Sequence, residues 1–315
     1  MKKNILLLET IAEEANQLLL DSEDIVVHTA FDGLPSAEIL SSIDAVITRG
    51  LGQVNQQLLD ACPRLQVAAR CGVGLDNVDV AAATQRKIKV VNAPGSNAAT
   101  VAEHAIALML LLQRNLFQAL NDVKSGNWAA RSTFKSDEVG GKTLGILGLG
   151  NIGLKVAKIA EALGMRIIYW SQSPKNVPYQ YVTKDELLAN SDIISIHVPL
   201  TTETENLINA EALSKVKPSC ILINTARGQI VDKAALVAAL NTGKLAGYGA
   251  DIPTSPAPAA DDPLIVQPKA LITAHVSSLT ATTYRNMCMS TVSNVLAILR
   301  GQAPQPGCIF NLKDL

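Results

Sequence analysis

The sequence lacks the features that mark several classes of protein. Lys and Arg number 27 against 28 Asp and Glu, and no long basic run disturbs this balance. A formal net charge of −1 gives no electrostatic case for nucleic acid or an anionic membrane as a partner. The longest apolar run, 105–112, falls well short of the roughly 20 residues of a membrane span. We therefore expect neither partner, and a small neutral or anionic ligand is the more natural one.

Signatures of metal sites and of nucleotide hydrolysis are missing as well. The five cysteines form no CxxC or other metal-ligand spacing, and no glycine-lysine phosphate loop is present. An odd number of cysteines, together with an initial apolar run (5–8) too short for a signal peptide, favours reduced thiols. The sequence thus predicts a cytoplasmic protein without a metal site.

Length and composition favour two well-packed domains. The chain has 315 residues, of which 48% are hydrophobic and only 17% are charged. Strand-like runs at 5–8, 25–28, 45–48 and 66–70 alternate with helical patterns near 11–20, 35–40 and 55–61. A second series of strand-like runs begins at Thr143 and continues at 166–170, 193–197, 220–224, 245–249 and 270–273. The alternation predicts two doubly wound α/β domains, each a parallel sheet with helices on both faces.

The order of these segments predicts a discontinuous first domain. A turn-rich segment, 92–97, precedes a long helix expected at 101–117 and makes a plausible hinge. The helical stretch 281–299 follows the last strand of the second series and could return to the first domain. We predict one domain from 1–98 plus 282–315, and a second domain, 99–281, inserted into it.

The strongest single motif is the Gly-x-Gly-x-x-Gly turn that follows the apolar run 143–147. Gly148 permits a tight strand-to-helix turn, Gly150 lets the backbone approach a pyrophosphate, and Gly153 lets helix and strand pack closely. The helix N-terminus that follows supplies partial positive charge. A dinucleotide site is the favoured interpretation, and a glycine-rich turn without a ligand is the alternative.

Several further motifs recur in an order and spacing that resemble one enzyme family. They are 70–79 (RCGVGLDNVD), 92–95 (NAPG), 101–104 (VAEH), 197–201 (HVPLT), 224–228 (NTARG) and 273–275 (TAH). With the Gly148 turn, they make the chain similar to the D-isomer-specific 2-hydroxyacid dehydrogenases over nearly its whole length. The resemblance implies a Rossmann-type cofactor domain inserted into a flavodoxin-like substrate domain. It also implies hydride transfer between NAD(P)H and a small 2-oxo acid, giving a D-2-hydroxy acid.

The same resemblance assigns the residues that handle the substrate. Arg227 would bind the carboxylate and carbonyl, and His275 would give a proton to the carbonyl oxygen. Arginine offers a fixed fork of donors, and histidine changes protonation state near neutral pH, so each side chain suits its role. Backbone N–H groups at Val73 and Gly74 would hold the carboxylate. Arg49 is a candidate substrate selector, with a surface or packing role as the open alternative.

Cofactor contacts are implied along the second domain. They are Gly148, Gly150, Asn151, Ile152, Gly153, Ser171, Gln172, His197, Val198, Pro199, Thr225, Ala226, Asp251 and Thr100. Asp251 would accept a hydrogen bond from the nicotinamide carboxamide, or else serve as an ordinary turn or cap aspartate. His197 is expected to line the cofactor site, whereas a structural role is expected for His104.

The segment after the second strand of this domain bears on the choice of cofactor. NAD-preferring sites usually carry a carboxylate there, which accepts hydrogen bonds from the ribose and repels a 2′-phosphate. By the family spacing that position falls on Ser171, and the run 170–175 (WSQSPK) contains no carboxylate. We hypothesise that NADP(H) is accepted. Neutral contacts that hold NAD(H) are the alternative.

One family residue is missing. The family normally carries a glutamate that hydrogen-bonds the catalytic histidine and raises its pKa. Its slot falls on Pro256, and no glutamate occurs between Glu211 and the last residue of the sequence. Either His275 still works as a proton donor with another partner, which we prefer, or the protein is an NAD(P)-binding sensor similar to the corepressors of this superfamily.

The long helix beginning at Val101 carries more apolar surface than one domain obviously needs. The family resemblance suggests a homodimer there. A helix buried within its own domain is the alternative.

Overall fold

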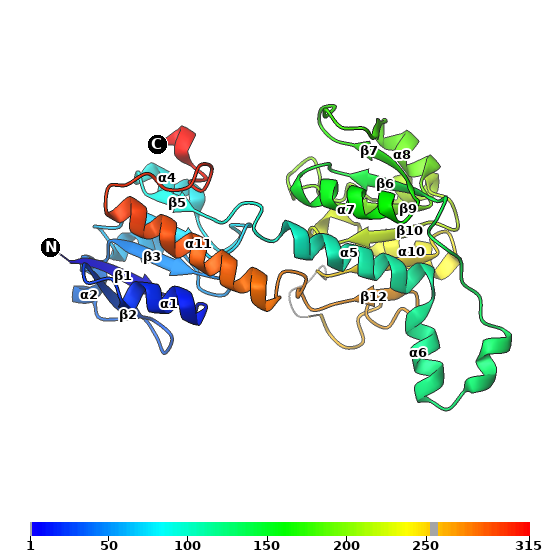
Figure 1. The fold of residues 1–315 in the computed structure, drawn as a ribbon, viewed down its shortest axis with the longest axis horizontal. Coiled ribbons are helices and arrows are strands. Elements are labelled where there is room, and N and C mark those ends of the chain that lie inside the picture. The colour runs from blue at the N-terminus through cyan, green and yellow to red at the C-terminus, as the bar shows by residue number, and fades with distance from the viewer. Residues whose placement is uncertain (1, 253–257) are drawn as a thin grey trace. The chain divides into compact units, whose positions relative to one another are not determined.

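The computed structural model describes residues 2–252 and 258–315, and the chain divides into two compact units. The first unit contains 1–97 and 279–315, and the second contains 98–278 (Figure 1). The boundaries predicted from the sequence, 98/99 and 281/282, lie one residue and three residues later than these. The difference has a local cause, because helix α5 (Ala98–Gln113) already begins at Ala98, and Thr280 already caps helix α11 (Ala281–Leu299).

Parallel strands form the centre of the first unit. In the described residues they run in the order β2-β1-β3-β4-β5. Their bounds are β1 (Lys3–Leu7), β2 (Ile25–Thr29), β3 (Ala45–Thr48), β4 (Val67–Arg70) and β5 (Lys89–Val91). Successive side chains point to opposite faces, so Ile5 and Leu7 enter one apolar cluster and Leu6 enters another.

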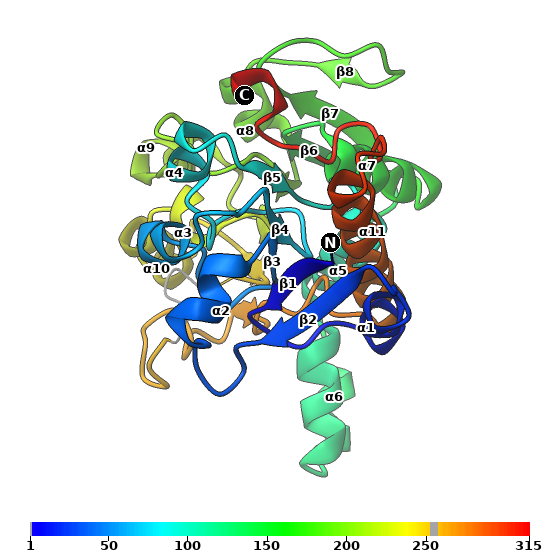
Figure 2. The same cartoon turned by 90° about the vertical axis from the view of Figure 1, so that its left-hand side faces the viewer.

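Helices cover both faces of this sheet, which explains why its strands read as nearly continuous apolar runs. They are α1 (Glu13–Leu20), α2 (Ala37–Ser42), α3 (Gln56–Ala61), α4 (Val80–Gln85) and α11. Figure 2 shows α1 and α11 on one side and α2, α3 and α4 on the other. Cys288, Val292 and Val295 of α11 are fully buried in the cluster that α1 shares, so the last part of the chain completes the core of the first unit.

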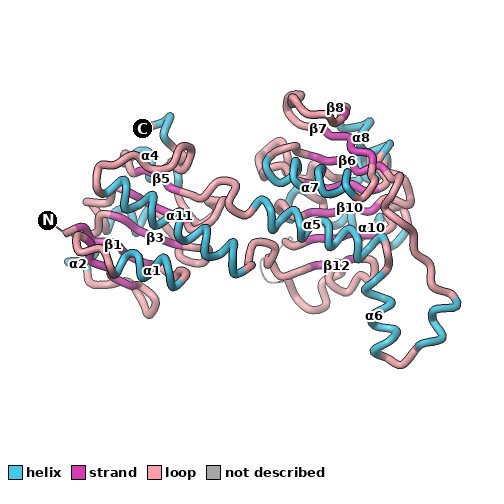
Figure 3. Tube along the Cα trace, viewed as in Figure 1, coloured by secondary structure: helices cyan, strands magenta, loops and turns pink. Residues whose placement is uncertain are grey.

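The second unit is built around a larger parallel sheet, in the order β12-β11-β10-β9-β6-β7-β8 among the described residues. Its strands are β6 (Thr143–Leu147), β7 (Arg166–Trp170), β8 (Gln180–Tyr181), β9 (Ile193–Ile196), β10 (Ile221–Asn224), β11 (Gly247–Ala250) and β12 (Ala270–Ile272). Helices α5 and α7 (Asn151–Ala162) pack on one face. Helices α8 (Lys184–Asn190), α9 (Ala210–Lys215) and α10 (Lys233–Thr242) pack on the other. Figure 3 shows each set of strands lying among its helices. The prediction of two parallel-sheet α/β domains is confirmed.

The predicted long helix is in fact two helices. Helix α5 ends at Gln113, Asn115 adopts a left-handed conformation with φ 47°, and α6 (Leu116–Lys124) begins after it. Asparagine tolerates this conformation better than most residues. Apolar residues resume at Leu116 directly after the three polar residues 113–115, so the sequence pattern did not reveal the break.

Exposed apolar side chains gather after this break. They are Leu116, Phe117, Leu120 and Val123 of α6, Trp128 of the short helix η1 (Trp128–Ser132), and Phe134. Figure 1 shows α6 and η1 projecting from the rest of the second unit. Helix α5, by contrast, buries residues such as Ala105, Leu108 and Met109 within its own unit. The unused apolar surface therefore lies on α6 and η1. In the described chain no helix combines the length and the apolar character that crossing a membrane requires.

Candidate functional site

The glycine turn has the geometry of a close strand-to-helix connection. Gly148, which follows β6, has φ +97°, and a Cβ there would lie 2.7 Å from the carbonyl carbon of His197. A Cβ on Gly153 would lie 2.3 Å from the carbonyl oxygen of Gly148. Both glycines are thus required for packing within the protein. Around Gly150, in contrast, a Cβ would meet no atom of the described residues within 4 Å.

The start of α7 is suited to an anion. Gly150 is its N-cap and supplies no side-chain hydrogen bond to the first backbone N–H groups. Asn151 is exposed and Ile152 is half-buried. An uncapped helix N-terminus carries N–H donors and partial positive charge. The open space at Gly150 would let a pyrophosphate approach these donors, so the residues present fit the cofactor that the sequence implies.

Uncharged residues at the end of β9 lie beside the Gly148 turn. The backbone N–H of His197 donates to the carbonyl of Leu147 over 2.7 Å, and its Nε2 lies 2.8 Å from the Ser195 hydroxyl. Burial lowers the pKa of His197 to about 4, so its ring is uncharged at neutral pH. Val198 is buried and Pro199 is exposed. These features match a lining role better than proton transfer.

A polar turn follows β10 and carries the candidate substrate arginine. The Asn224 side chain accepts from the Ala226 N–H at 3.0 Å and donates to the Arg227 carbonyl at 2.9 Å. Arg227 is partly exposed, and its Nη1 donates to the Ala226 carbonyl at 2.7 Å. The Thr225 hydroxyl is buried and finds no hydrogen-bond partner in the described residues. Such an orphaned group fits a site that a ligand completes. Asn224 was quoted within the sequence motif 224–228 but was given no role there, although its place at a strand end was a usable signal.

Asp251, after β11, organises the loop that carries the candidate histidine. One carboxylate oxygen accepts from the Thr273 hydroxyl at 2.6 Å and from the Val276 N–H at 2.9 Å, and the other accepts from the Ser277 N–H at 2.8 Å. Burial raises the pKa of Asp251, but these hydrogen bonds outweigh it and leave the pKa lowered. The Asp251 side chain thus has a structural task inside the protein, with the residue 0% exposed.

His275 itself is exposed and has an unusual backbone. Its N–H donates to the Asp251 carbonyl at 2.7 Å, and its φ is +55°. A non-glycine residue with positive φ costs conformational energy and needs surrounding contacts to persist. His104 of α5 contacts the same loop, with Nε2 2.9 Å from the Thr273 hydroxyl and 3.7 Å from an Asp251 carboxylate oxygen. Thr100, one turn earlier, donates to the Ser277 carbonyl at 3.2 Å.

The position expected from the sequence to discriminate between cofactors lies at the end of β7. Ser171 is largely buried, and its hydroxyl donates to the Ser173 carbonyl at 2.6 Å. Gln172 and Lys175 are exposed. The Ser171 proton is therefore already used, while the exposed amide and ammonium groups beside it remain accessible to a ligand.

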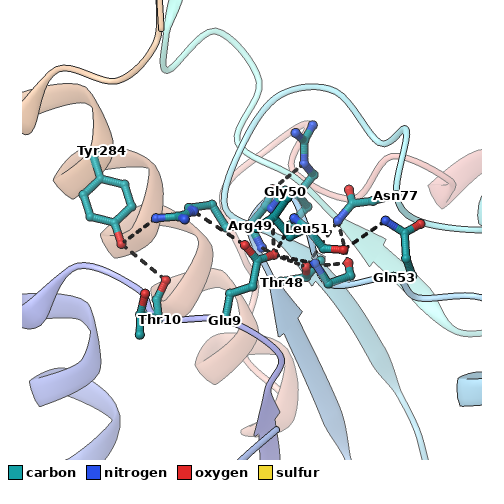
Figure 4. A network of polar contacts seen from close by, with 11 residues as sticks. Glu9, Thr10, Thr48, Arg49, Gly50, Leu51, Gln53, Asn77 and Tyr284 are labelled. Atoms are coloured by element: carbon teal, nitrogen blue, oxygen red, sulfur yellow. Dashed lines mark hydrogen bonds and ion pairs between the residues drawn. The ribbon is translucent and has the colours of Figure 1, made fainter. Parts of the chain in front are cut away.

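The candidate substrate residues of the first unit follow adjacent strands. After β4, the Val73 carbonyl accepts from the Asn92 side chain at 2.7 Å, and the Gly74 carbonyl contacts Nη1 of Arg70. In the part of the chain that the structure describes, the N–H groups of Val73 and Gly74 have no acceptor. These N–H groups can donate hydrogen bonds to the carboxylate of a bound ligand. Arg49 follows β3 and contacts Glu9 and Tyr284 (Figure 4).

In the second unit the predicted residues come together at one edge of the sheet. Gly148, His197, Arg227 and Asp251 follow β6, β9, β10 and β11, which are consecutive parallel strands. Ligands of open α/β sheets bind at this carboxyl edge, where the strand order reverses beside β6. Among the described residues, no group of His, Cys, Asp and Glu side chains could hold a metal ion. Pro256 lies outside the described residues.

Comparison with known proteins adds a family and its relatives. Residues 106–277 match the family model described as D-isomer specific 2-hydroxyacid dehydrogenase, NAD binding domain. A hydroxypyruvate reductase of Thermotoga maritima is 37% identical over 91% of this chain and 95% of its own length. A D-3-phosphoglycerate dehydrogenase of Archaeoglobus fulgidus is 37% identical over 94% of this chain. The match spans only 57% of that longer protein.

Solved structures share the fold across the chain. A protein of Thermus thermophilus is 36% identical, with a TM-score of 0.88 over 96% of this chain and 98% of its own. An NADPH-dependent glyoxylate/hydroxypyruvate reductase of Sinorhizobium meliloti, solved with NADP and malonate, is 32% identical, with a TM-score of 0.84 over 95% and 94% of the two chains. Both similarities extend over both units.

Proposed function

Because the chain belongs to the D-isomer specific 2-hydroxyacid dehydrogenase family and has an NAD(P)(H)-binding domain, we propose that it reduces a small 2-oxo acid to a D-2-hydroxy acid, reversibly. The observation that carries the proposal is the placement of the glycine turn, Arg227 and the His275 loop at neighbouring strand ends of one sheet. The match to the Thermotoga maritima hydroxypyruvate reductase, which covers 91% of this chain and 95% of that protein, supports it.

Residues of the second unit would hold the cofactor. The N–H groups of Gly150, Asn151 and Ile152, at the start of α7, would donate to the pyrophosphate, which the open space around Gly150 would let approach. The Thr225 hydroxyl can take a hydrogen bond from the ligand. The rest of the cofactor-site lining that the resemblance implies consists of His197, Val198, Pro199, Ala226 and Thr100. The reduced nicotinamide supplies the hydride when it is bound.

The substrate would be held and protonated by other groups. The Arg227 guanidinium binds the carboxylate and the keto oxygen, and its charge stabilises the negative charge that develops on that oxygen. The N–H groups of Val73 and Gly74 take the carboxylate as well. His275 gives its proton to the keto oxygen, and the Asp251 carbonyl fixes the backbone that carries the ring.

A second candidate follows from the missing glutamate. No glutamate occurs in 212–315, so the partner that usually raises the pKa of the family histidine is absent from that part of the sequence. An NAD(P)-binding sensor with little or no turnover would have the same fold and cofactor turn. The two candidates differ in turnover and agree in binding.

The deciding experiment measures both properties. Purified protein is assayed for NADH and NADPH oxidation with a panel of 2-oxo acids, and cofactor binding is measured by calorimetry. We expect turnover that falls about 10²- to 10⁴-fold in His275→Gln, with cofactor binding retained. Binding without turnover across the panel would instead establish the sensor.

A finer proposal concerns the cofactor. Ser171 and the absence of a carboxylate in 170–175 support use of NADPH, and a strong NADH preference in kcat/KM would overturn that.

We also propose a cytoplasmic homodimer, and the exposed apolar side chains of α6 and η1 support it. Light scattering that gives a monomer mass at micromolar concentration would contradict the dimer.

A further inference from the structure

Two side chains of α5 hold the segment that carries His275. Thr100 and His104 are four residues apart, so they lie on one face of the helix. The Thr100 hydroxyl donates to the Ser277 carbonyl at 3.2 Å, and Nε2 of His104 lies 2.9 Å from the Thr273 hydroxyl. The helix therefore contacts this segment on both sides of His275, and all of these residues belong to the second unit.

Helix α5 is itself packed tightly against the sheet. Asp251 follows β11, and Gly249 belongs to that strand. A Cβ on Gly249 would lie 3.1 Å from Cδ1 of Leu112 and 3.2 Å from Cβ of Leu108, both of α5. Leu108 is buried in the apolar cluster that α5 shares with β10. The helix therefore has little freedom to shift over β11, and His104 contacts the end of that strand from a fixed position.

The Thr273 hydroxyl has one proton to donate, and its surroundings decide where that proton goes. The oxygen lies 2.6 Å from a carboxylate oxygen of Asp251 and 3.3 Å from the Ala250 carbonyl. The shorter contact to the charged acceptor takes the proton, because charge-assisted hydrogen bonds are the stronger ones. Toward His104 the hydroxyl can then only accept, so Nε2 of that ring is the donor. His104 therefore carries a proton on Nε2.

Asp251 connects this arrangement to the backbone of His275. The carboxylate oxygen that takes the Thr273 proton also accepts the Val276 N–H at 2.9 Å, and the Asp251 carbonyl accepts the His275 N–H at 2.7 Å. His275 has a φ of +55°, a conformation that persists only where surrounding contacts hold it. Because Asp251 is fully buried, water does not replace a donor that its carboxylate loses.

We propose that His104 is a positioning residue for the proton donor His275. Its Nε2–H group fixes the Thr273 hydroxyl, Thr273 directs its proton at the Asp251 carboxylate, and Asp251 holds the backbone that carries the His275 ring. The effect on turnover rests on the proposed function. The hydrogen-bonded chain itself belongs to the second unit alone, and it gives His104 a task beyond the structural role expected from the sequence.

The first test separates the N–H donor from the ring that carries it. His104→Phe keeps a ring and removes the donor, whereas His104→Gln offers an amide N–H of similar reach. The His104 side chain is 22% exposed, so we expect both variants to fold. His104→Phe should lower kcat about tenfold and change KM and the cofactor Kd by less than about twofold, because a displaced proton donor loses rate and not binding. His104→Gln should restore kcat to within about threefold of wild type.

A double-variant cycle tests whether the effect passes through Thr273. Thr273→Val removes the hydroxyl and should lower kcat by a factor similar to that of His104→Phe. The two substitutions together should lower kcat by no more than about twofold beyond either one alone, because both break the same chain. Losses that multiply would show that His104 acts independently of Thr273, and would overturn this route.

A matched control removes a hydrogen bond elsewhere in the same unit. Tyr179→Phe deletes the hydroxyl that donates to a Glu161 carboxylate oxygen at 3.1 Å. Neither residue belongs to the hydrogen-bonded chain from His104 to His275. We therefore expect kcat, KM and the cofactor Kd of this variant to equal those of the wild-type protein.

Amide hydrogen exchange keeps the inference separate from the proposed reaction, because it needs no turnover. The backbone N–H groups of 275–277 all donate to Asp251, the first to its carbonyl and the other two to its carboxylate. We expect these groups to exchange about 5- to 10-fold faster in His104→Phe, the equivalent of one lost neutral hydrogen bond. His104→Gln and Tyr179→Phe should exchange at the wild-type rate.

Turnover and exchange together distinguish the two proposals. A protein that reduces no 2-oxo acid yet shows the faster exchange contradicts the proposed reaction and supports the hydrogen-bonded chain from His104 to the His275 backbone. Unchanged exchange in His104→Phe overturns the inference whatever the turnover. Equal losses of kcat in His104→Phe and His104→Gln would place the effect in packing of the ring, and would overturn the donor role as well.

Discussion

Two loops at strand ends, one in each unit, are built in the same way around a carboxylate. The Glu9 carboxylate accepts hydrogen bonds from the backbone N–H groups of 49–52, and the Asp251 carboxylate accepts them from the N–H groups of 276 and 277. Each also accepts a threonine hydroxyl, from Thr48 and Thr273 respectively, and each has a lowered pKa. The first loop contains Arg49, the candidate substrate selector, and the second contains His275, the proposed proton donor.

The loops differ in what balances the charge. Arg49 places a permanent cation 3.7 Å from Glu9, whereas the basic side chain near Asp251 is His104, also at 3.7 Å, which is charged only when protonated. Asp251 is fully buried, and its own carbonyl also holds the His275 backbone. The loop that carries His275, the proposed proton donor, therefore depends on neutral donors, and the loop that carries Arg49, the candidate substrate selector, depends on an ion pair.

The largest expected effect is that of Asp251→Asn. The amide group would present N–H atoms to backbone N–H donors that now face a carboxylate oxygen, and the buried position offers no water to relieve this. We expect a loss of about 3 kcal/mol in the free energy of unfolding, measured by urea denaturation, and a marked fall in kcat. Full stability with normal kcat would show that the loop does not depend on this carboxylate.

Glu9→Gln should cost less, about 1 to 2 kcal/mol by the same measurement. The amide oxygen can still accept from the N–H groups of 49–52, and only the fixed charge and the pairing with Arg49 are lost. If Glu9→Gln proves more destabilising than Asp251→Asn, the distinction between an ion-paired and a neutrally compensated loop is wrong.

Acid should remove the difference in the free energy of unfolding between the wild-type protein and Glu9→Gln. A carboxyl group with a lowered folded-state pKa contributes stability above its ordinary pKa of 4.5 and loses it as pH falls through about 2. Between these values the wild-type protein should lose stability more steeply than Glu9→Gln, and the two curves should converge. Parallel curves from pH 6 to pH 2 would mean that ionised Glu9 does not stabilise the fold.

The smallest effect is expected from the hydroxyl donors. Thr273→Val removes one of the three hydrogen bonds described above for the Asp251 carboxylate and should cost about 1 kcal/mol in the free energy of unfolding. Thr273→Ser serves as the matched variant that restores the hydroxyl. A Ser variant no more stable than the Val variant would place the cost in packing of the methyl group.

What the sequence could and could not predict follows from the range of the interactions. Gly148 and Gly153 act within one turn, so their spacing was enough to predict the close strand-to-helix connection. The roles of Gly150 and Ser171 toward a cofactor stay predictions. Glu9 carried no comparable signal, since its donors are backbone groups 40 to 43 positions away, and almost any residue has an N–H. The apolar excess of the predicted helix was real, but the break at Asn115 places its exposed part on α6.

The part of the chain after 278 gives the protein a definite order of assembly during synthesis. The second unit is continuous, so all of its residues leave the ribosome while the first unit still lacks α11. Until then Ile5, Leu7 and Val67 of its sheet have no Val292 or Val295 to cover them. Since domains fold as units when their residues are available, we expect the inserted unit to fold first. Until α11 is synthesised, the apolar side chains that it covers in the first unit should stay exposed.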